Sequence, residues 1–194
     1  HRDLHSFPTR RSSDLPRGYI HTLRHRLGTV PFTIVDKTRT RDPVDFGFRA
    51  RLHPYQAAAL RDIASRRFGV LEAPPGAGKT VIALSAIGLR KQPALVIVHT
   101  KELLYQWQKR ACEFLDMRSD EVGLIGDGHR RIGERLTVAL INSLYRAIDE
   151  VRPAVGHLVV DECHHVPART FTDAVGLFDS TYMLGLSATP YRRD

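Results

Sequence analysis

Short apolar runs alternate with amphipathic stretches along most of the chain. The runs that we interpret as strands are Gly69–Ala73, Ala94–Val98, Thr137–Ile141, His157–Val160 and Tyr182–Leu186. Apolar residues recur at helical spacing in Pro54–Arg67, Lys79–Arg90, Lys101–Leu115, Ser143–Val151 and Ala168–Phe178. Strands that are apolar throughout are typical of a parallel sheet whose two faces are both covered by helices. The pattern therefore predicts an α/β domain with a parallel sheet.

The residues before this alternating region follow a less regular pattern. Apolar spacing predicts a short helix in Pro16–Gly28, the run Val30–Val35 is typical of a strand, and Asp36–Asp45 is typical of a charged linker. The first fifteen residues, HRDLHSFPTRRSSDL, have no apolar period. They resemble the in-frame translation of a short-read sequencing adapter. We therefore exclude His1–Leu15 from fold reasoning as a non-native segment, and expect both ends of the sequence to be arbitrary.

A phosphate-binding loop is predicted between the first apolar run and the next helix. The string is Ala73-Pro74-Pro75-Gly76-Ala77-Gly78-Lys79-Thr80, with alanine where the motif has its first glycine. Small residues let backbone N–H groups point at a phosphate at the positive end of a helix. Lys79 is placed to reach the β and γ phosphates of ATP, and the Thr80 hydroxyl to ligate Mg²⁺. A chance Gly-Lys-Thr in an ordinary turn is the alternative.

A second candidate site follows the run His157–Val160. Asp161 and Glu162 come at its carboxyl end, ahead of Cys163, His164 and His165. ATP hydrolysis needs one carboxylate to hold Mg²⁺, which suits Asp161, and another to orient and deprotonate water, which suits Glu162. A zinc site built from the cysteine and the two histidines is an alternative, although adjacent residues rarely face one metal. A solvated loop is another.

Composition and charge narrow the class of protein. The 194 residues suffice for one full domain, 42% are hydrophobic, and the formal net charge is +8. This charge favours acidic partners such as nucleic acid without proving one. The chain contains no apolar run near the length of about 20 residues that a membrane span needs, and its two cysteines are too few for a disulfide framework. We expect no membrane segment and a cytoplasmic location.

These strings, together with Ser187-Ala188-Thr189-Pro190, resemble the superfamily 2 helicases and translocases of the DExH type. The nearest likeness is to the XPB-like branch and to the motor subunits of type I and type III restriction systems, over Arg51 to Asp194. The resemblance implies a RecA-like P-loop domain that uses ATP and Mg²⁺ and acts on DNA. It implies that Lys79, Asp161 and Glu162 are catalytic, and that ATP is held by Gln56, Pro75, Gly76, Ala77, Gly78, Lys79 and Thr80.

The resemblance also assigns residues to a nucleic-acid track and to its coupling with the ATP site. It implies nucleic-acid contacts by Thr100, Lys101, Gly126, Asn142 and Ser143, and coupling by His164, Ser187 and Thr189. Plainer alternatives stay open. Gln56 is also typical of a polar helix start, Gly126–Arg131 of a basic turn, and Ser187–Pro190 of a simple turn. Trp107 could stack on a base, but its helical spacing with Leu103, Leu104 and Ala111 favours the core.

The resemblance further implies a domain organisation. Residues 1–15 are then non-native, 16–48 form a partial N-terminal region and linker, and 49–194 form the ATP-binding lobe. Motors of this type hold ATP between two RecA-like lobes, and we expect the second lobe to be missing from this sequence. The predicted function is an ATP-dependent DNA helicase or translocase. The alternatives are a non-hydrolytic nucleic-acid-binding scaffold, an RNA helicase and an unrelated P-loop ATPase.

Overall fold

The computed structural model describes residues 25–29, 35–163 and 176–188. A boundary between two compact units falls after Asp36, and the second unit, Lys37–Asp194, contains the sheet. Of the predicted helix Pro16–Gly28, only the end lies in the described residues, where 25–27 are helical. The predicted strand Val30–Val35 lies outside them apart from Val35, which is not in a strand. Within the described residues, no helix has the length and apolar character to span a membrane.

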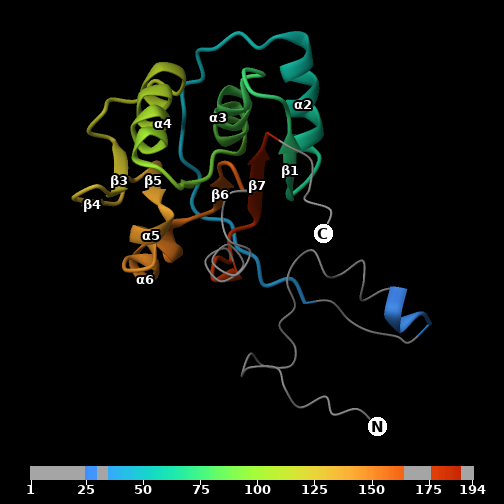
Figure 1. Cartoon of the computed structure of the whole chain (residues 1–194). Coiled ribbons are helices and arrows are strands. Elements are labelled where there is room, and N and C mark those ends of the chain that lie inside the picture. Colours follow the sequence, from blue (N-terminus) through green and yellow to red (C-terminus); the bar gives the residue numbers. More distant parts are fainter. Residues whose placement is uncertain (1–24, 30–34, 164–175, 189–194) are drawn as a thin grey trace. The chain divides into compact units, whose positions relative to one another are not determined.

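A seven-stranded sheet forms the centre of the described part of the domain (Figure 1). Its strands are β1 (Phe68–Glu72), β2 (Ala94–Val98), β3 (Val122–Gly126), β4 (His129–Arg131), β5 (Leu136–Leu140), β6 (His157–Val160) and β7 (Tyr182–Ser187). Their spatial order is β1-β7-β6-β2-β5-β3-β4. All neighbours pair in parallel except β3 and β4, which form an antiparallel hairpin. The predicted parallel sheet is confirmed.

Helices cover both faces of the sheet, as the apolar strands predict. The long helices are α2 (Pro54–Ala64), α3 (Lys79–Arg90) and α4 (Lys101–Phe114), and the short ones are α5 (Ile141–Leu144), α6 (Ile148–Val151) and the 3₁₀ turn η2 (Arg152–Ala154). Figure 1 shows α2, α3 and α4 together, with α5 and α6 on the other side of the strands. Within β2, Val96 belongs to the core under α3 and α4, whereas Leu95 belongs to the core with α5 and α6. This alternation follows from the two-residue period of a strand.

The segment before α2 is extended and is tied to the domain. The backbone N–H of Arg41 donates to Oε1 of Gln92 at 2.6 Å, and the Gln92 amide donates back to the Arg41 carbonyl at 3.1 Å. The Arg41 guanidinium forms an ion pair with Asp179 at 2.7 Å. Phe46 and Phe48 pack against the core under α3 and α4. Residues 37–50 therefore contribute packing to the domain despite their lack of regular structure.

Most predicted elements are present in the structure, but several of their bounds differ. The helix predicted at Ser143–Val151 is wrong as a single helix, because it consists of α5 and α6. The strands predicted at Gly69–Ala73 and Thr137–Ile141 each begin and end one residue earlier, and the helix predicted at Pro54–Arg67 ends at Ala64. The sequence does not predict the hairpin β3–β4. The helix predicted at Ala168–Phe178 lies mostly outside the described residues. In the hairpin, Asp127 and Gly128 have φ of 50° and 83°. A two-residue hairpin turn of type I′ requires positive φ at both of its central residues.

Candidate ATP and nucleic-acid sites

Apart from Gln56 on α2, the predicted site residues that the structure describes lie at or follow the carboxyl ends of parallel strands, so the topology places them along one edge of the sheet. The phosphate loop follows β1, Asp161 follows β6, and Ser187 ends β7, which lies between those two strands. Thr100, Gly126 and Asn142 come at the ends of β2, β3 and β5, which are neighbours in the other half of the sheet. In open α/β sheets ligands bind at this edge. The fold thus brings the predicted ATP residues to one part of the edge and the predicted nucleic-acid residues to the adjoining part.

The loop between β1 and α3 has the backbone of a phosphate cradle. Gly76 and Gly78 have φ of 80° and 77°, a conformation that is costly for residues with a Cβ. Gly78 is the N-cap of α3, so the loop delivers its backbone N–H groups to the positive end of a twelve-residue helix. Pro75 and Gly76 are exposed, whereas Ala77 and Thr80 are half-buried. One side of the loop is consequently accessible to solvent, and the other side packs against the domain.

Lys79 lies folded onto this loop. Its side chain is 9% exposed, and Nζ donates to the carbonyl oxygen of Ala73 at 3.0 Å and to that of Pro74 at 3.5 Å. These two carbonyls hold the ammonium group at the loop. An ammonium group held at the loop by neutral carbonyls is well placed to form charge-assisted hydrogen bonds with phosphate oxygens. This arrangement is what the phosphate-loop prediction expects of Lys79, and it favours that prediction over a chance Gly-Lys-Thr in an ordinary turn.

Gln56 joins helix α2 to the phosphate loop. It is 5% exposed, its Oε1 accepts from the backbone N–H of His53 at 3.0 Å, and its Nε2 donates to the carbonyl of Ala77 at 3.2 Å. The Tyr55 hydroxyl donates to the same carbonyl at 3.3 Å. The alternative of a plain surface glutamine is therefore wrong. A side-chain amide can make four hydrogen bonds, so two remain for the predicted contact with adenine.

Asp161 is a buried carboxylate with both oxygens engaged by the protein. It is 6% exposed, its Oδ2 accepts from Nε1 of Trp107 at 2.7 Å, and its Oδ1 accepts from the backbone N–H of Glu162 at 3.0 Å. Burial is the largest influence on its pKa and raises it. The Trp107 hydrogen bond lowers the pKa, as does the charge of Lys79. The charge of Lys79 thus acts on Asp161 although the two residues come from different strand ends.

Backbone hydrogen bonds fix the relative positions of the three strand ends around the ATP site. Ala73 N–H donates to the Ser187 carbonyl at 3.1 Å, and Cys163 N–H donates to the Leu186 carbonyl at 3.0 Å. Strand β7 therefore holds the start of the phosphate loop on one side and Asp161–Glu162, here called the acidic box, on the other. Glu162 has φ of 48°, in the left-handed region. Such strain persists where the surrounding structure imposes it, and it occurs often at functional sites.

The residues present fit ATP and Mg²⁺. A loop with two left-handed glycines and a folded lysine suits phosphate oxygens. The buried carboxylate of Asp161 and the hydroxyl of Thr80 supply oxygen ligands, which a hard cation prefers. When bound, Mg²⁺ would neutralise charge that develops on the phosphoryl oxygens. Asp161 and Thr80 are the residues that would hold it.

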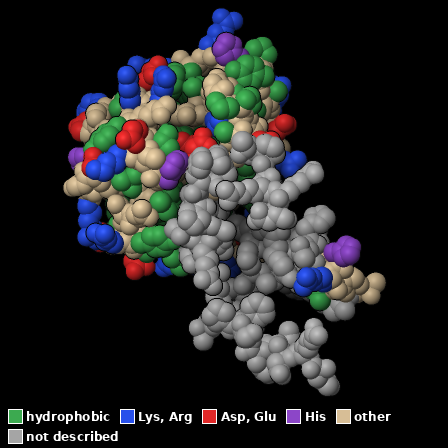
Figure 2. All heavy atoms as spheres, viewed as in Figure 1, with side chains coloured by type: hydrophobic (Ala, Val, Ile, Leu, Met, Phe, Trp, Pro, Cys, Tyr) green, Lys and Arg blue, Asp and Glu red, His purple; other side chains and the backbone are tan. Residues whose placement is uncertain are grey.

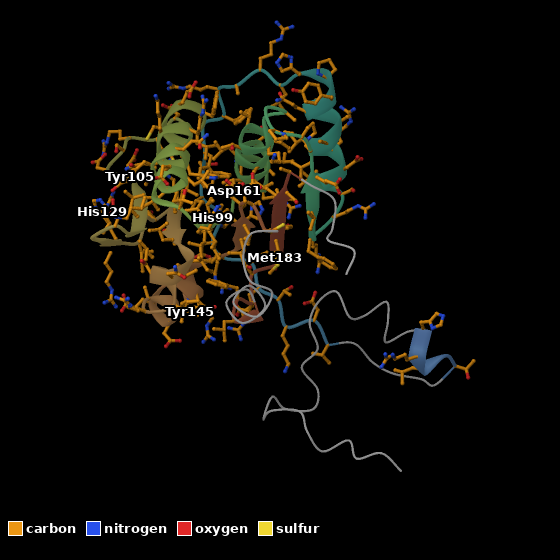
Figure 3. The ribbon with its side chains drawn as sticks, viewed as in Figure 1. His99, Tyr105, His129, Tyr145, Asp161 and Met183 are labelled. Carbon is orange, nitrogen blue, oxygen red and sulfur yellow. The ribbon has the colours of Figure 1, made fainter. Side chains whose placement is uncertain are left out.

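The predicted nucleic-acid residues lie at the strand ends beside this site. Thr100 caps α4, and its hydroxyl accepts from the backbone N–H of Leu103 at 3.3 Å. Lys101 is exposed and paired with Asp127, whose other carboxylate oxygen accepts from the Tyr105 hydroxyl at 2.8 Å. Figure 3 shows Tyr105 next to His129, well away from Asp161. Asn142 is exposed and Ser143 half-buried, whereas Gly126 is buried, with φ of 122°.

Basic side chains do not gather into one patch on the face seen in Figure 2, where Lys and Arg are interspersed with acidic and other side chains. Arg130 is paired with Glu150. The Arg131 guanidinium donates to the Val122 carbonyl at 2.7 Å. Net charge by itself therefore does not identify the nucleic-acid surface, and the strand-end residues carry that assignment.

Three of the predicted residues lie outside the described part of the chain, and the sequence does not predict the contact between Trp107 and Asp161. His164 and Thr189 lie outside the described residues, as does His165 of the alternative zinc site. Trp107 is 1% exposed and packs in the core under α3 and α4, so the expectation of core packing is confirmed. Its hydrogen bond to Asp161 was not foreseen. A single buried tryptophan on a helix that starts at the site is the sequence signal for such a contact, because a buried indole N–H needs an acceptor.

The comparisons with known proteins agree with this geometry. The model of the family described as the type III restriction enzyme, res subunit, matches residues 49–192. The chain is 33% identical over 169 residues to the DNA 3'-5' translocase XPB2 of Sulfurisphaera tokodaii, a match that covers 87% of this chain and 35% of that protein. It is 22% identical over 218 residues to the general transcription and DNA repair factor IIH helicase/translocase subunit XPB of Schizosaccharomyces pombe, covering 98% of this chain and 26% of that one.

A solved structure shows the same fold. The UvsW helicase from bacteriophage T4 is 19% identical, with a TM-score of 0.69, over 89% of this chain and 70% of that chain. The chain spans only about a third of the length of its Sulfurisphaera relative and about a quarter of the Schizosaccharomyces one. The comparisons thus describe one part of longer proteins.

Proposed function

Since the chain belongs to the family described as the type III restriction enzyme, res subunit, we propose that residues 49–194 are the ATP-binding lobe of a DNA translocase or helicase. The observation that carries the proposal is the meeting of the phosphate loop and the acidic box at one sheet edge, with β7 between them. Relatives named as a DNA translocase and a DNA repair factor subunit support DNA as the track. A second RecA-like lobe would complete the motor.

In this lobe each residue has a distinct task. The backbone of Pro75 to Gly78 and the ammonium of Lys79 bind and orient the phosphates, and Thr80 and Asp161 hold Mg²⁺. Glu162 orients the attacking water and takes its proton. Gln56 contacts adenine. Ser187, together with His164 and Thr189, relays the state of the nucleotide to the nucleic-acid residues.

The DNA part of the proposal can be tested at the start of α4. The Lys101 ammonium group is predicted to contact a DNA backbone phosphate, and its ion pair with Asp127 positions it. Lys101→Ala should weaken binding of duplex and single-stranded DNA about equally for all sequences, and should reduce the slope of log affinity against log salt by roughly one. Fluorescence anisotropy of labelled DNA over a salt series measures both quantities.

A matched control lies on the same helix. Lys109 is exposed and stands two turns further from the strand ends, so Lys109→Ala makes the same charge change away from the proposed track. It should leave the salt slope unchanged. Equal losses in both variants would show that binding follows net charge alone. Tighter binding of RNA than of DNA would favour an RNA helicase.

A further inference from the structure

Trp107 and Asp161 meet in the interior although they come from different elements. Trp107 stands in the middle of α4, and Asp161 directly follows β6. Both are buried, at 1% and 6% exposure, and the indole nitrogen lies 2.7 Å from Oδ2. Figure 3 shows Asp161 inside the domain. The tip of a core side chain on one helix therefore lies against a carboxylate of the ATP site.

Packing alone does not explain this contact. A buried aromatic ring gains its packing free energy from its carbon surface, which a phenylalanine also supplies. The indole adds one directional N–H donor, and here the acceptor is a carboxylate, which makes the hydrogen bond charge-assisted. The other oxygen of Asp161 accepts from the Glu162 backbone N–H at 3.0 Å. Two donors from different directions thus fix the rotation of the carboxylate group.

We propose that Trp107 is a positioning residue that orients the Asp161 carboxylate for Mg²⁺. This inference rests on the proposed function, in which Asp161 is the Mg²⁺ ligand. Mg²⁺ accepts only near-ideal octahedral geometry and gives up its waters reluctantly, so the direction of a ligand's lone pairs matters to it. Groups that orient metal ligands typically contribute about tenfold to a hundredfold in metal affinity. Trp107 acts through Asp161 and touches neither nucleotide nor metal itself.

The composition of the chain makes the test unusually selective. Trp107 is the one tryptophan in the sequence, so its replacement by 3-benzothienylalanine in a tryptophan-requiring host changes this position alone. That analogue keeps the ring shape and puts sulfur in place of the N–H group. Trp107→Phe is the genetically encoded counterpart. If Phe leaves a cavity that lowers stability, the isosteric analogue still removes only the donor.

The measurement is the affinity for a fluorescent ATP analogue, titrated with Mg²⁺ and again in EDTA. We expect loss of the N–H donor to raise the Mg²⁺ concentration for half-maximal binding about tenfold or more. Affinity in EDTA, which depends on the phosphate loop, should stay the same. In the unsubstituted chain, tryptophan emission should change when Mg²⁺ and nucleotide are added together, because Trp107 senses the occupied carboxylate.

The matched control is Tyr105→Phe, on the same helix. It also removes a donor to an aspartate, since the Tyr105 hydroxyl donates to Asp127 at 2.8 Å, but the contact is exposed and involves another carboxylate. The control should show the unsubstituted Mg²⁺ dependence. If Trp107→Phe and the benzothienylalanine form both kept the unsubstituted Mg²⁺ concentration for half-maximal binding, the positioning role of Trp107 would be overturned. If even the unsubstituted chain bound nucleotide without regard to Mg²⁺, the proposed function itself would fail, which is a different result.

Discussion

Lys79 and Glu162 are predicted to act at different stages of the reaction. Lys79 neutralises phosphate charge in the ground state, from its position against the Ala73 carbonyl, whereas Glu162 acts on water. Lys79→Ala should therefore weaken nucleotide binding by about tenfold to a hundredfold or more, the effect of losing a charge-assisted hydrogen bond. Glu162→Gln should keep the affinity and lose turnover in the two-lobe enzyme. Equilibrium binding and phosphate release separate the two, and equal loss of affinity in both variants would reverse our assignment.

His157 gives the domain a specific sensitivity to acid. Its ring is fully buried at the start of β6, next to the Tyr182 ring, and burial, with a smaller effect of the Arg90 charge, lowers its pKa to about 3. Below the ordinary histidine pKa of 6.5, His157 becomes protonated in the unfolded chain but stays neutral in the folded chain. Stability is thus full above that pKa and falls as the pH drops toward 3.

From pH 7 to pH 5 this histidine should account for a loss of about 2 kcal/mol in the free energy of unfolding. In His157→Leu the pH dependence should shrink by that amount, whatever the absolute stability of the variant. His53→Gln removes an exposed histidine and should keep the full dependence. Urea unfolding at several pH values measures it. Parallel curves for the unsubstituted chain and His157→Leu would be the contrary result.

At the scale of single residues, the sequence indicated which residues are candidates for function, but it did not predict the contacts that these residues make. The proposed roles of Lys79 and Asp161 follow from a motif and from a position at a strand end. The bond between Trp107 and Asp161 did not, because it depends on how α4 packs on the sheet, and Trp107 by its spacing is only a core residue. The capture of Gln56 by the Ala77 carbonyl likewise depends on the packing of α2 beside the loop.

The phosphate loop offers a prediction at the scale of elements. Gly76 and Gly78 both have left-handed φ, but a Cβ on Gly76 would meet open space, whereas one on Gly78 would overlap the Gln56 side-chain amide. Gly76→Ala should cost about 1–2 kcal/mol from backbone strain alone. Gly78→Ala should cost more and should also weaken nucleotide binding more, because Gln56 must leave the loop. Chemical unfolding and nucleotide titration of the pair check this, and equal effects would contradict it.

Elements with a clear apolar pattern and clear flanking residues were predicted well, and several others were not. Helix α3 and strands β2 and β6 have their predicted limits, because each has a clear apolar pattern bounded by glycine, proline or charged residues. The hairpin β3–β4 was missed although Asp127-Gly128 is a strong hairpin signal. Its second strand, His129–Arg131, is exposed and basic, so it carries no apolar pattern. Helices α5 and α6 are too short to be separated by spacing.

At the scale of the whole molecule, the first fifteen residues are predicted to add nothing to stability. The reason is their resemblance to an adapter and their lack of apolar pattern. Residues 16–194 should melt at the same temperature as residues 1–194. A drop of several degrees on truncation, which corresponds to roughly 1 kcal/mol or more, would show that His1–Leu15 belongs to the fold. Calorimetry of the two chains under one buffer condition decides it.

The fold class could be predicted from alternating apolar runs, and the sheet confirms it, but the order of strands could not. The order of strands determines which sites lie next to each other. Strand β7 comes last in the described sequence yet lies between β1 and β6, and it therefore links the phosphate loop to the acidic box. The contribution of residues 37–50 to the packed domain also escaped prediction. Their charged sequence is typical of a linker, but their contacts with Gln92 and Asp179 and the packing of Phe46 and Phe48 show that they are held.

The central claim is that this chain is one lobe of a two-lobe motor, and phosphate release tests it most directly. In the proposed assignment the lobe supplies the phosphate loop, the Mg²⁺ ligands and the base. An arginine that stabilises the transferred phosphoryl group contributes about 10³–10⁵ in rate, and we propose that this arginine comes from the second lobe. Residues 1–194 should bind ATP with Mg²⁺ weakly and hydrolyse it barely, with or without DNA, and DNA-stimulated turnover should appear when the second lobe is joined. Turnover by residues 1–194 alone at about one per second or faster, a typical enzymatic rate, would contradict the account.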